Sequence, residues 1–365
     1  MKRGNMELEE LTLEQKVGQL LFVGLDVNQP KSIIEELIVK QKVGGILLYK
    51  KNYQSINEMV ELINELKKLN RKVSSVPLWI GIDQEGGRVN RLPPEVLNFA
   101  SAYQLAKSGD ESLIKESASL MAELLQQLGV NVNFAPVLDR FTTSLTSAIG
   151  DRAFGQEVKQ IALWGDIVRK EFEKHNILSV VKHFPGHGST NKDSHRWIPN
   201  TQKTIEQLEK EDMIPFLYAI QEGADALLVG HLIVPHMTHH HPATISKTFI
   251  QGYLREQLNY QGLIFTDDMR MKAVELLYGK NQAGLKAMLS GNDVIMLKYS
   301  GKDQVFEKIK KQLTRKKGLE EQLNASVRRI LRVKEKYHLS DKEIDNPYFS
   351  LDDINQKIQS IRDRC

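Results

Sequence analysis

Cysteine is almost absent from this sequence: among 365 residues the one cysteine is Cys365, at the end of the chain. Such a chain has no internal disulfide, and this is typical of proteins from a reducing compartment. Long apolar runs are absent as well, so no segment is expected to span a membrane. The apolar run from Leu20 to Leu25 is too short for the core of a signal peptide. We therefore expect a cytoplasmic protein that does not bind membranes.

An excess of either charge is also missing. The chain has 50 Lys and Arg against 46 Asp and Glu, and the basic residues are scattered rather than clustered. Nucleic-acid binding therefore has no support in the composition. No linker rich in Pro, Gly or Ser and no low-complexity tract divides the chain. Its length and apolar content are enough for one large domain with a sizeable core.

The sequence does contain a regular alternation of short apolar runs and longer amphipathic stretches. The runs are rich in Val, Ile, Leu or Phe and too short for typical helices, as expected of strands that are buried on both faces. They cover residues 20–26, 43–49, 77–83, 130–139, 178–184, 225–234, 262–268 and 292–298. The amphipathic stretches cover residues 55–70, 111–129, 158–176, 204–223 and 319–337. This pattern predicts an α/β protein, a single TIM-like (β/α)8 barrel in residues 1–340, with residues 341–365 as a C-terminal tail that packs on the barrel.

Chemically reactive side chains gather where these runs end. They are Asp83, Asp139, Lys182, His183, His231, Asp267 and Asp268. Active sites of such barrels lie at the C-terminal ends of the strands, so we expect these side chains to converge there. Asp267 and Asp268 are neighbours and point to opposite faces of a strand. Alternation alone does not say which of the two enters the site.

The segment VKHFPGHGSTNKDSH, residues 181–195, is the richest in such groups. It begins as an apolar strand and continues as a loop, in which a proline and two glycines exclude a regular element. Asp193 and His195 lie two residues apart, a spacing at which the carboxylate is able to hold the imidazole. A histidine held in this way can carry a proton near neutral pH.

The predicted strand ends and loops contain the groups needed to cleave a glycosidic bond: two carboxylates, a lysine, arginines and an Asp–His pair. A retaining glycosidase uses one group to attack the anomeric carbon and another to protonate the departing oxygen. Further charged donors and acceptors are suited to binding sugar hydroxyls. The residues therefore favour a glycosidase.

The segments DQEGGRVNR, NFAPVLD, GDRAFG, KHFPGHGSTNKDSH and TDDMRM together resemble glycoside hydrolase family 3. The resemblance runs from about Leu13 to Lys336 and is closest to the β-N-acetylglucosaminidase branch. Bacterial members of this branch remove N-acetylglucosamine (GlcNAc) from peptidoglycan fragments during cell-wall recycling. The most specific elements are KHFPGHG and DSH, because the β-glucosidases of the family lack that loop histidine.

The resemblance implies a role for each matching position. Asp267 is expected to be the nucleophile, and His195 the general acid/base that Asp193 orients and charges. The residues expected to bind the sugar are Asp83, Arg91, Arg152, Lys182 and His183. Neither a cofactor nor a metal is expected. The expected partner is a glycan with a terminal GlcNAc, from peptidoglycan or from chitooligosaccharides, and we expect a monomer.

Three other functions stay open at this point. A phosphorylase on the same scaffold would use phosphate instead of water, and a neutral histidine repels phosphate less than a carboxylate does. A metal-dependent barrel hydrolase would use the many His and Asp residues, although no His pair at helical ligand spacing supports it. A sugar-binding protein without activity would need neither Asp267 nor the Asp193–His195 pair.

Two further features have no assigned role. The histidine-rich tract formed by His236 and residues 239–241 is expected to be an exposed loop rather than a metal site. Trp197 follows the predicted acid/base closely and is either a wall on which the sugar stacks or a packing aromatic.

Overall fold

The computed structural model describes most of the chain. The described residues are 7–25, 31–141, 148–188, 190, 199–279, 281–298, 304–316, 318–345 and 350–365.

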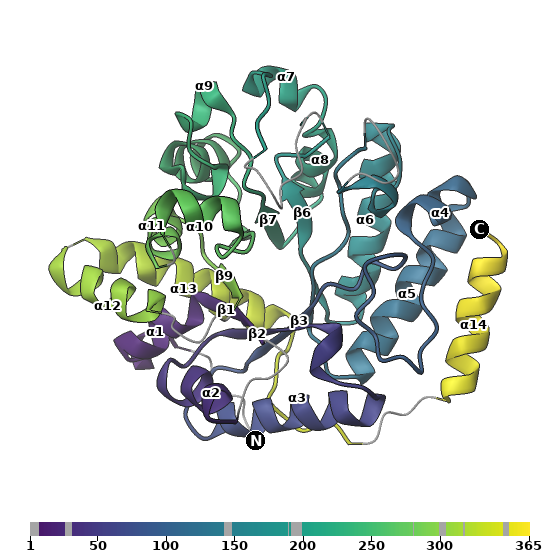
Figure 1. The fold of residues 1–365 in the computed structure, drawn as a ribbon, viewed down its shortest axis with the longest axis horizontal. Helices are drawn as coiled ribbons and strands as arrows, with labels where there is room; N and C mark the ends of the chain where they lie inside the picture. The colour runs from purple at the N-terminus through teal and green to yellow at the C-terminus, as the bar shows by residue number, and fades with distance from the viewer. Residues whose placement is uncertain are drawn as a thin grey trace.

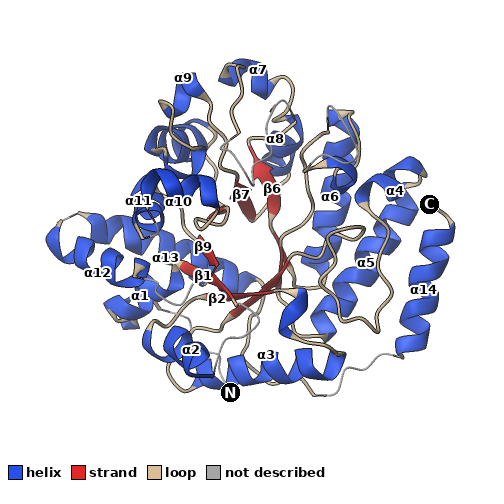
Figure 2. Cartoon of the chain, viewed as in Figure 1, coloured by secondary structure: helices blue, strands red, loops and turns tan. Residues whose placement is uncertain are grey.

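Parallel strands occupy the centre of the molecule and helices surround them (Figures 1 and 2). One sheet has the order β5-β4-β3-β2-β1-β9, and a second sheet has the order β6-β7-β8. The strands are β1 (Leu21–Gly24), β2 (Gly45–Leu48), β3 (Trp79–Ile82), β4 (Val132–Asn133), β5 (Leu178–Ser179), β6 (Val181–Phe184), β7 (Ala226–Val229), β8 (Leu263–Thr266) and β9 (Ile295–Lys298). Each lies inside one of the eight predicted apolar runs.

The two sheets continue into each other at both ends. Strands β5 and β6 are separated only by Val180, whose N–H donates to the carbonyl of Asn133. At the other end, the N–H of Thr266 in β8 donates to the carbonyl of Val294, directly before β9. Counting β5 and β6 as one, eight strand positions therefore follow one another around the centre. This arrangement confirms the predicted barrel-like α/β fold.

Aromatic rings fill the interior of the strand ring. Phe22 lies 5.4 Å from Phe134 and 6.0 Å from Phe265 between ring centroids, and it stacks on Trp79 at 6.3 Å. All four side chains are buried. Gly81 makes room for this cluster, because a Cβ at this position would lie 2.5 Å from the ring of Phe22. The interior is therefore a packed core, which leaves the ends of the strands as the place for a site.

Helices follow the strands along the chain. They are α1 (Leu13–Gln19), α2 (Lys31–Glu35), α3 (Ile56–Arg71), α4 (Ala102–Lys107), α5 (Glu111–Gln127), α6 (Val158–Lys174), α7 (Ile205–Glu209), α8 (Ile214–Gln221), α9 (Pro235–Thr238), α10 (Lys272–Tyr278), α11 (Gln282–Ser290), α12 (Val305–Arg315), α13 (Leu319–Lys336) and α14 (Leu351–Asp363). Two π-helices, Glu36–Lys40 and Thr248–Gln257, complete the longer elements. The prediction of one helix over residues 204–223 is wrong, because α8 starts anew with Pro215 in its first turn, where the missing N–H costs nothing.

Lys334, in α13, closes the end of the strand ring opposite to the expected site. Its ammonium group donates to the Gln19 side chain at 2.8 Å and to the carbonyls of Gly44 and Pro77 at 2.9 and 2.7 Å. It also lies 4.5 Å from the centroid of the Trp79 ring. Gly44 directly precedes β2 and Pro77 lies two residues before β3, so this buried side chain ties the N-terminal ends of these two strands together.

The C-terminal helix α14 packs beside α5 (Figure 1). Its apolar side chains Ile354, Ile358 and Ile361 are buried, and Arg364 forms a 2.7 Å ion pair with Glu116 of α5. The predicted domain boundary at residue 340 stays a prediction.

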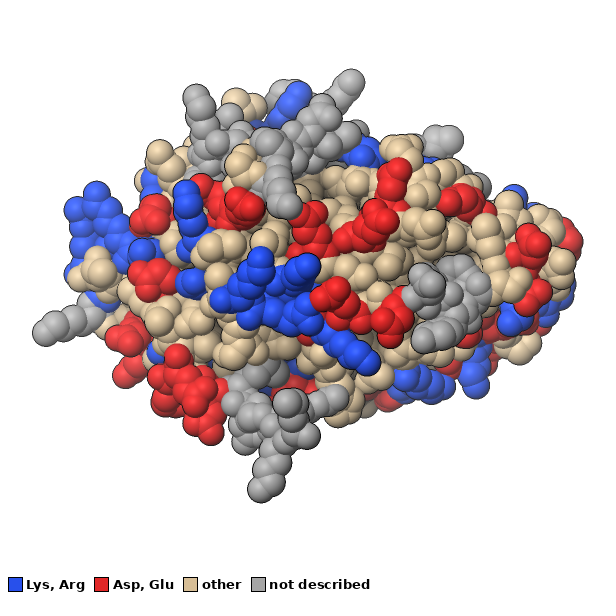
Figure 3. Space-filling view, turned by 90° about the horizontal axis from the view of Figure 1, so that it is seen from below, with Lys and Arg blue, Asp and Glu red and all other residues tan. Residues whose placement is uncertain are grey.

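The surface carries charges of both signs. On the face shown in Figure 3, Lys and Arg side chains lie among Asp and Glu side chains. None of the helices in the described ranges is both long enough and apolar enough to cross a membrane.

Candidate functional site

Lys182 lies at the centre of the charged groups at the C-terminal ends of the strands. It is part of β6, and its ammonium group contacts Asp83 Oδ1 at 2.8 Å and Glu85 Oε1 at 2.6 Å. Glu85 in turn accepts two hydrogen bonds from Arg152, from Nε to Oε2 and from Nη2 to Oε1, both at 2.8 Å. We call these four residues, Asp83, Glu85, Arg152 and Lys182, the lysine network.

Three members of the lysine network, Glu85, Lys182 and Arg152, are held in their charged forms. Burial would raise the pKa of Glu85, but Lys182 and Arg152 hold it well below its usual value. Burial would lower the pKa of Lys182, but Asp83 and Glu85 raise it. Burial acts in the same way on Arg152, and Glu85 again reverses the effect and raises its pKa. Each charge is therefore kept by its partners inside the protein.

Asp139 organises a second group of side chains. It is completely buried, and its Oδ2 accepts from His183 Nδ1 at 2.6 Å and from the His183 N–H at 3.1 Å. Its Oδ1 accepts from the N–H of His187 at 2.7 Å. Burial would raise the pKa of Asp139, but His183 and His187 lower it. Burial lowers the pKa of His187 to about 4, so this ring is neutral at pH 7.

Asp267 and Asp268 follow β8 and have different surroundings. Burial would raise the pKa of Asp267, but His231, His183 and the N–H of Asp268 lower it, so its carboxylate is ionised. That N–H donates to Asp267 Oδ1 at 2.8 Å. Asp268 instead uses Oδ1 to accept from the N–H groups of Arg270 at 2.9 Å and Lys298 at 3.0 Å, and its burial raises its pKa. Asp268 therefore holds the turn, and Asp267 is the carboxylate near the histidines.

His231 fixes the turn that carries both carboxyl groups. It is buried, its Nδ1 lies 2.8 Å from Thr244 Oγ1, and its Nε2 lies 3.0 Å from the carbonyl oxygen of Asp268. A carbonyl only accepts, so Nε2 carries the hydrogen of this bond.

The structure brings together Asp83, Arg152, Lys182, His183 and Asp267 of the predicted site residues. Their charges influence each other: the field of Asp83 and Asp139 acts on Arg152, and that of His183 on Asp267. Arg91 lies beside Tyr53, whose hydroxyl donates to its carbonyl at 2.7 Å. In the part of the chain that the structure describes, the Arg91 guanidinium forms a hydrogen bond only with the carbonyl of Asn90.

The predicted acid/base pair, Asp193 and His195, lies outside the described residues, as does Trp197. The start of their loop is described. A Cβ on Gly188 would lie 2.5 Å from Arg140 Cγ and 2.8 Å from Asp212 Oδ1, so the glycine permits close packing on this ion pair.

Several residues of the site received no role from the sequence. They are Glu85, Asp139, His187 and His231. Glu85 stands two residues after Asp83, and the period-two alternation of an extended chain places such residues on the same side. This two-residue spacing is the feature of the sequence that could have predicted Glu85 as a neighbour of Asp83.

The histidine tract after β7 is exposed, as predicted, and His241 Nδ1 lies 2.9 Å from Tyr278 Oη. Among the described residues, no group of three His, Cys, Asp or Glu side chains has a geometry that could hold a metal ion.

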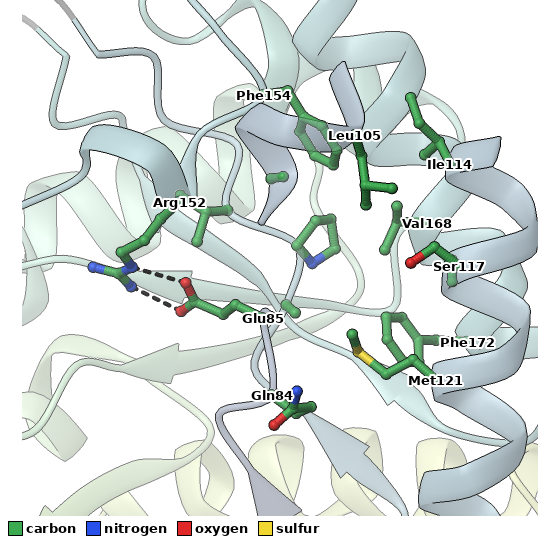
Figure 4. A pocket seen from close by; sticks show the side chains of 15 residues that line it. Gln84, Glu85, Leu105, Ile114, Ser117, Met121, Arg152, Phe154, Val168 and Phe172 are labelled. Carbon is green, nitrogen blue, oxygen red and sulfur yellow. Dashed lines mark hydrogen bonds and ion pairs between the residues drawn. The ribbon is translucent and has the colours of Figure 1, made fainter. Parts of the chain in front are cut away.

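A cavity of about 40 Å³ lies on the other side of the Glu85–Arg152 pair, between the strands and helices α4, α5 and α6 (Figure 4). Apolar side chains such as Leu105, Met121 and Phe172 form most of its wall. Two buried polar atoms in the wall, Gln84 Nε2 and Ser117 Oγ, have no hydrogen-bond partner within the described structure. This volume exceeds the roughly 10–15 Å³ that a cavity needs in order to hold one water molecule.

Comparisons with known proteins agree on one family. The family described as "Glycosyl hydrolase family 3 N terminal domain" matches residues 12–333. A β-hexosaminidase from Idiomarina loihiensis is 34% identical over 257 residues, which are 69% of this chain and 76% of that protein. A β-hexosaminidase from Xylella fastidiosa is 33% identical over 260 residues, 69% of this chain and 75% of that protein. The solved structure of a family 3 β-N-acetylglucosaminidase from Paenibacillus sp. str. FPU-7 superimposes with a TM-score of 0.89 at 31% identity, covering 97% of this chain and 69% of that chain.

Proposed function

Because this chain belongs to glycosyl hydrolase family 3, we propose that it removes terminal β-linked GlcNAc from the nonreducing ends of glycans, with retention of configuration. The family and the glycosidase class predicted from the sequence motifs are confirmed by these matches. The observation that carries the proposal is Asp267: a half-buried carboxylate at the end of β8 whose pKa is lowered, next to an Asp268 whose carboxylate accepts from two backbone N–H groups.

In the first step, a carboxylate oxygen of Asp267 attacks the anomeric carbon and the bond to the leaving oxygen breaks. The leaving oxygen takes a proton from His195, and a covalent glycosyl-enzyme forms. In the second step, His195 takes a proton from water, and the water oxygen displaces Asp267 from the anomeric carbon. Asp193 favours the charged form of His195 that the first step requires. The lowered pKa of Asp267 supports the role of nucleophile, because the attacking group must be ionised.

We propose that the hydroxyl groups of the sugar are bound by Asp83, Arg152, Lys182 and His183. Asp83, Arg152 and His183 are more accessible than Lys182: their side chains are 24%, 15% and 12% exposed, against 3% for Lys182. A carboxylate accepts from sugar hydroxyls, and an imidazole whose Nδ1 donates to Asp139 presents Nε2 to a ligand. Arg91 is proposed to join them from the neighbouring loop.

The proposed natural substrates are peptidoglycan fragments with a terminal GlcNAc, and chitooligosaccharides present the same sugar. Two of the compared proteins are called β-hexosaminidases and a third a β-N-acetylglucosaminidase, which supports GlcNAc as the sugar. The preference for peptidoglycan rests on the KHFPGHG and DSH elements. A cytoplasmic location and a monomeric state stay predictions.

The test is turnover of an aryl β-GlcNAc substrate against the aryl β-glucoside, with the first product anomer observed by NMR. We expect a strong preference for the GlcNAc substrate and the β-anomer as first product. Release of the α-anomer would exclude the covalent mechanism, and a preference for glucoside would exclude the sugar. Repeating the assay in phosphate tests the phosphorylase alternative, which would yield the sugar 1-phosphate.

A further inference from the structure

Glu85 is the one carboxylate that contacts both cations of the lysine network. Oε1 accepts from Lys182 Nζ at 2.6 Å and from Arg152 Nη2 at 2.8 Å, and Oε2 accepts from Arg152 Nε at 2.8 Å. Its side chain is 5% exposed. It is therefore shielded from bulk water and satisfied by the two side chains that are proposed to bind the sugar.

These contacts use up most of the donors of the two cations. Lys182 has three N–H groups and gives one to Glu85 and one to Asp83, which leaves one to donate to a ligand. Arg152 gives Nε and Nη2 to Glu85, and its Nη1 donates to the carbonyl of Ala148 at 3.2 Å. Each cation is thus held in one orientation, with few donors left to point at the sugar.

The surroundings of Glu85 leave little else to hold these charges in place. Figure 4 shows the paired Glu85 and Arg152 at one side of a cavity, with Leu105, Phe154 and Phe172 on its other walls. Apolar side chains do not solvate an arginine that has lost its partner. Lys182 and Arg152 also repel each other, since the field of Arg152 lowers the pKa of Lys182. Loss of the Glu85 charge would therefore leave this repulsion uncompensated, and both cations would move away from their present positions.

We propose that Glu85 is a positioning residue: through its contacts with Lys182 and Arg152 it fixes the groups that bind the nonreducing sugar, without itself touching the substrate. This inference rests on the proposed function, because it takes these two cations as sugar ligands. It agrees with the burial of the network: the side chains of Lys182 and Glu85 are almost completely buried, whereas Asp83 remains accessible.

The experiment compares wild type and Glu85→Gln in the full-length protein. Glutamine keeps the volume of the side chain but removes the charge and turns a donor toward the two cations. We expect KM for aryl β-GlcNAc and the inhibition constant of free GlcNAc to rise together, each at least about 10-fold, with a smaller change in kcat. Glu85→Asp keeps the charge and should recover part of the affinity. Unchanged KM and inhibition constant in Glu85→Gln would overturn the proposal.

Two further variants separate positioning from general stability. Asp293 is also a fully buried carboxylate with two arginine partners, Arg255 and Arg329, but lies before β9 at the opposite end of the ring. Asp293→Asn should lower the melting temperature and leave the GlcNAc inhibition constant unchanged. The double variant Glu85→Gln/Arg152→Gln should lose less affinity for GlcNAc than the sum of the two single losses, because Glu85 acts partly through Arg152. Fully additive losses would overturn the proposal.

Failure of the proposed function has a different signature, since wild type itself would then neither hydrolyse the aryl substrate nor bind GlcNAc. If Glu85→Gln does not fold, the comparison is made with Glu85→Asp. A raised inhibition constant in a folded Glu85→Asp supports the positioning role, and an unchanged one overturns it.

Discussion

Asp267 and Asp268 are neighbours in sequence, but their substitution by alanine should have opposite consequences. In Asp267→Ala the proposed nucleophile is lost, and we expect turnover to fall at least about 10⁴-fold. The stability cost should be small. The side chain accepts one described hydrogen bond, from the N–H of Asp268, and its loss also removes a half-buried negative charge.

In Asp268→Ala the turn after β8 loses the acceptor for two backbone N–H groups, those of Arg270 and Lys298. Arg270 is buried, so its N–H would remain unsatisfied at a cost of about 1–3 kcal/mol, whereas Lys298 is exposed and water can replace the acceptor. For a chain of 365 residues, that cost corresponds to a drop in melting temperature of roughly 1–4 °C. We expect Asp268→Ala to lose stability and to keep measurable turnover.

The assay combines thermal unfolding with turnover of an aryl β-GlcNAc substrate, and a fluorinated slow substrate identifies the labelled carboxylate by mass spectrometry. The label should be found on Asp267. A label on Asp268, or an Asp268→Ala variant that is fully stable but as inactive as Asp267→Ala, would refute the assignment.

Three further predictions concern other parts of the molecule. His195→Ala should reduce turnover of a natural disaccharide far more than that of an aryl substrate with a good leaving group, and azide should restore the second step as glycosyl azide; equal losses without azide rescue would remove His195 from catalysis. Burial lowers the pKa of Lys334 to about 7, whereas a lysine in an unfolded chain has a pKa of about 10.4. Between about pH 7 and about pH 10.4 the unfolded state therefore binds more protons than the folded state, so the free energy of unfolding rises with pH. The stability of wild type minus that of Lys334→Met should therefore increase from pH 7 to pH 9 by about 1–3 kcal/mol in chemical denaturation, and a flat difference would contradict this. Ser117→Ala removes a buried hydroxyl without a described partner and should raise the melting temperature slightly with KM unchanged; a clear decrease would show that the cavity holds a water bonded to Ser117.

The fold could be predicted from sequence because its strands are buried on both faces and its helices on one. These two patterns differ clearly in period and length, so all eight runs contain observed strands. The break between α7 and α8 was not predicted, because apolar residues continue at helical spacing across it. The effect of Pro215 is local: it lies in the first turn of α8.

The site was predictable only in part. Strand ends pointed to Lys182, His183 and Asp267 because barrel topology places those positions together. The role of Glu85 depends on where a side chain 67 residues further along the chain, Arg152, comes to lie, and no local pattern carries that information. Asp193 and His195 stay predictions, since they lie outside the described residues.

The separation of the lysine network along the chain has a consequence for how the protein folds. Lys182 meets Asp83 across 99 residues, and Arg152 meets Glu85 across 67. Before contacts of such long range can form, the chain between the partners must be closed into a loop, which costs conformational entropy. Until β3 and β6 are joined through β4, each of these charges must stay in water, because burying any one alone would cost more than folding can supply. The lysine network therefore cannot be completed before β6 is in place, because Lys182 belongs to that strand, and a nascent chain released before β6 has no means of assembling it.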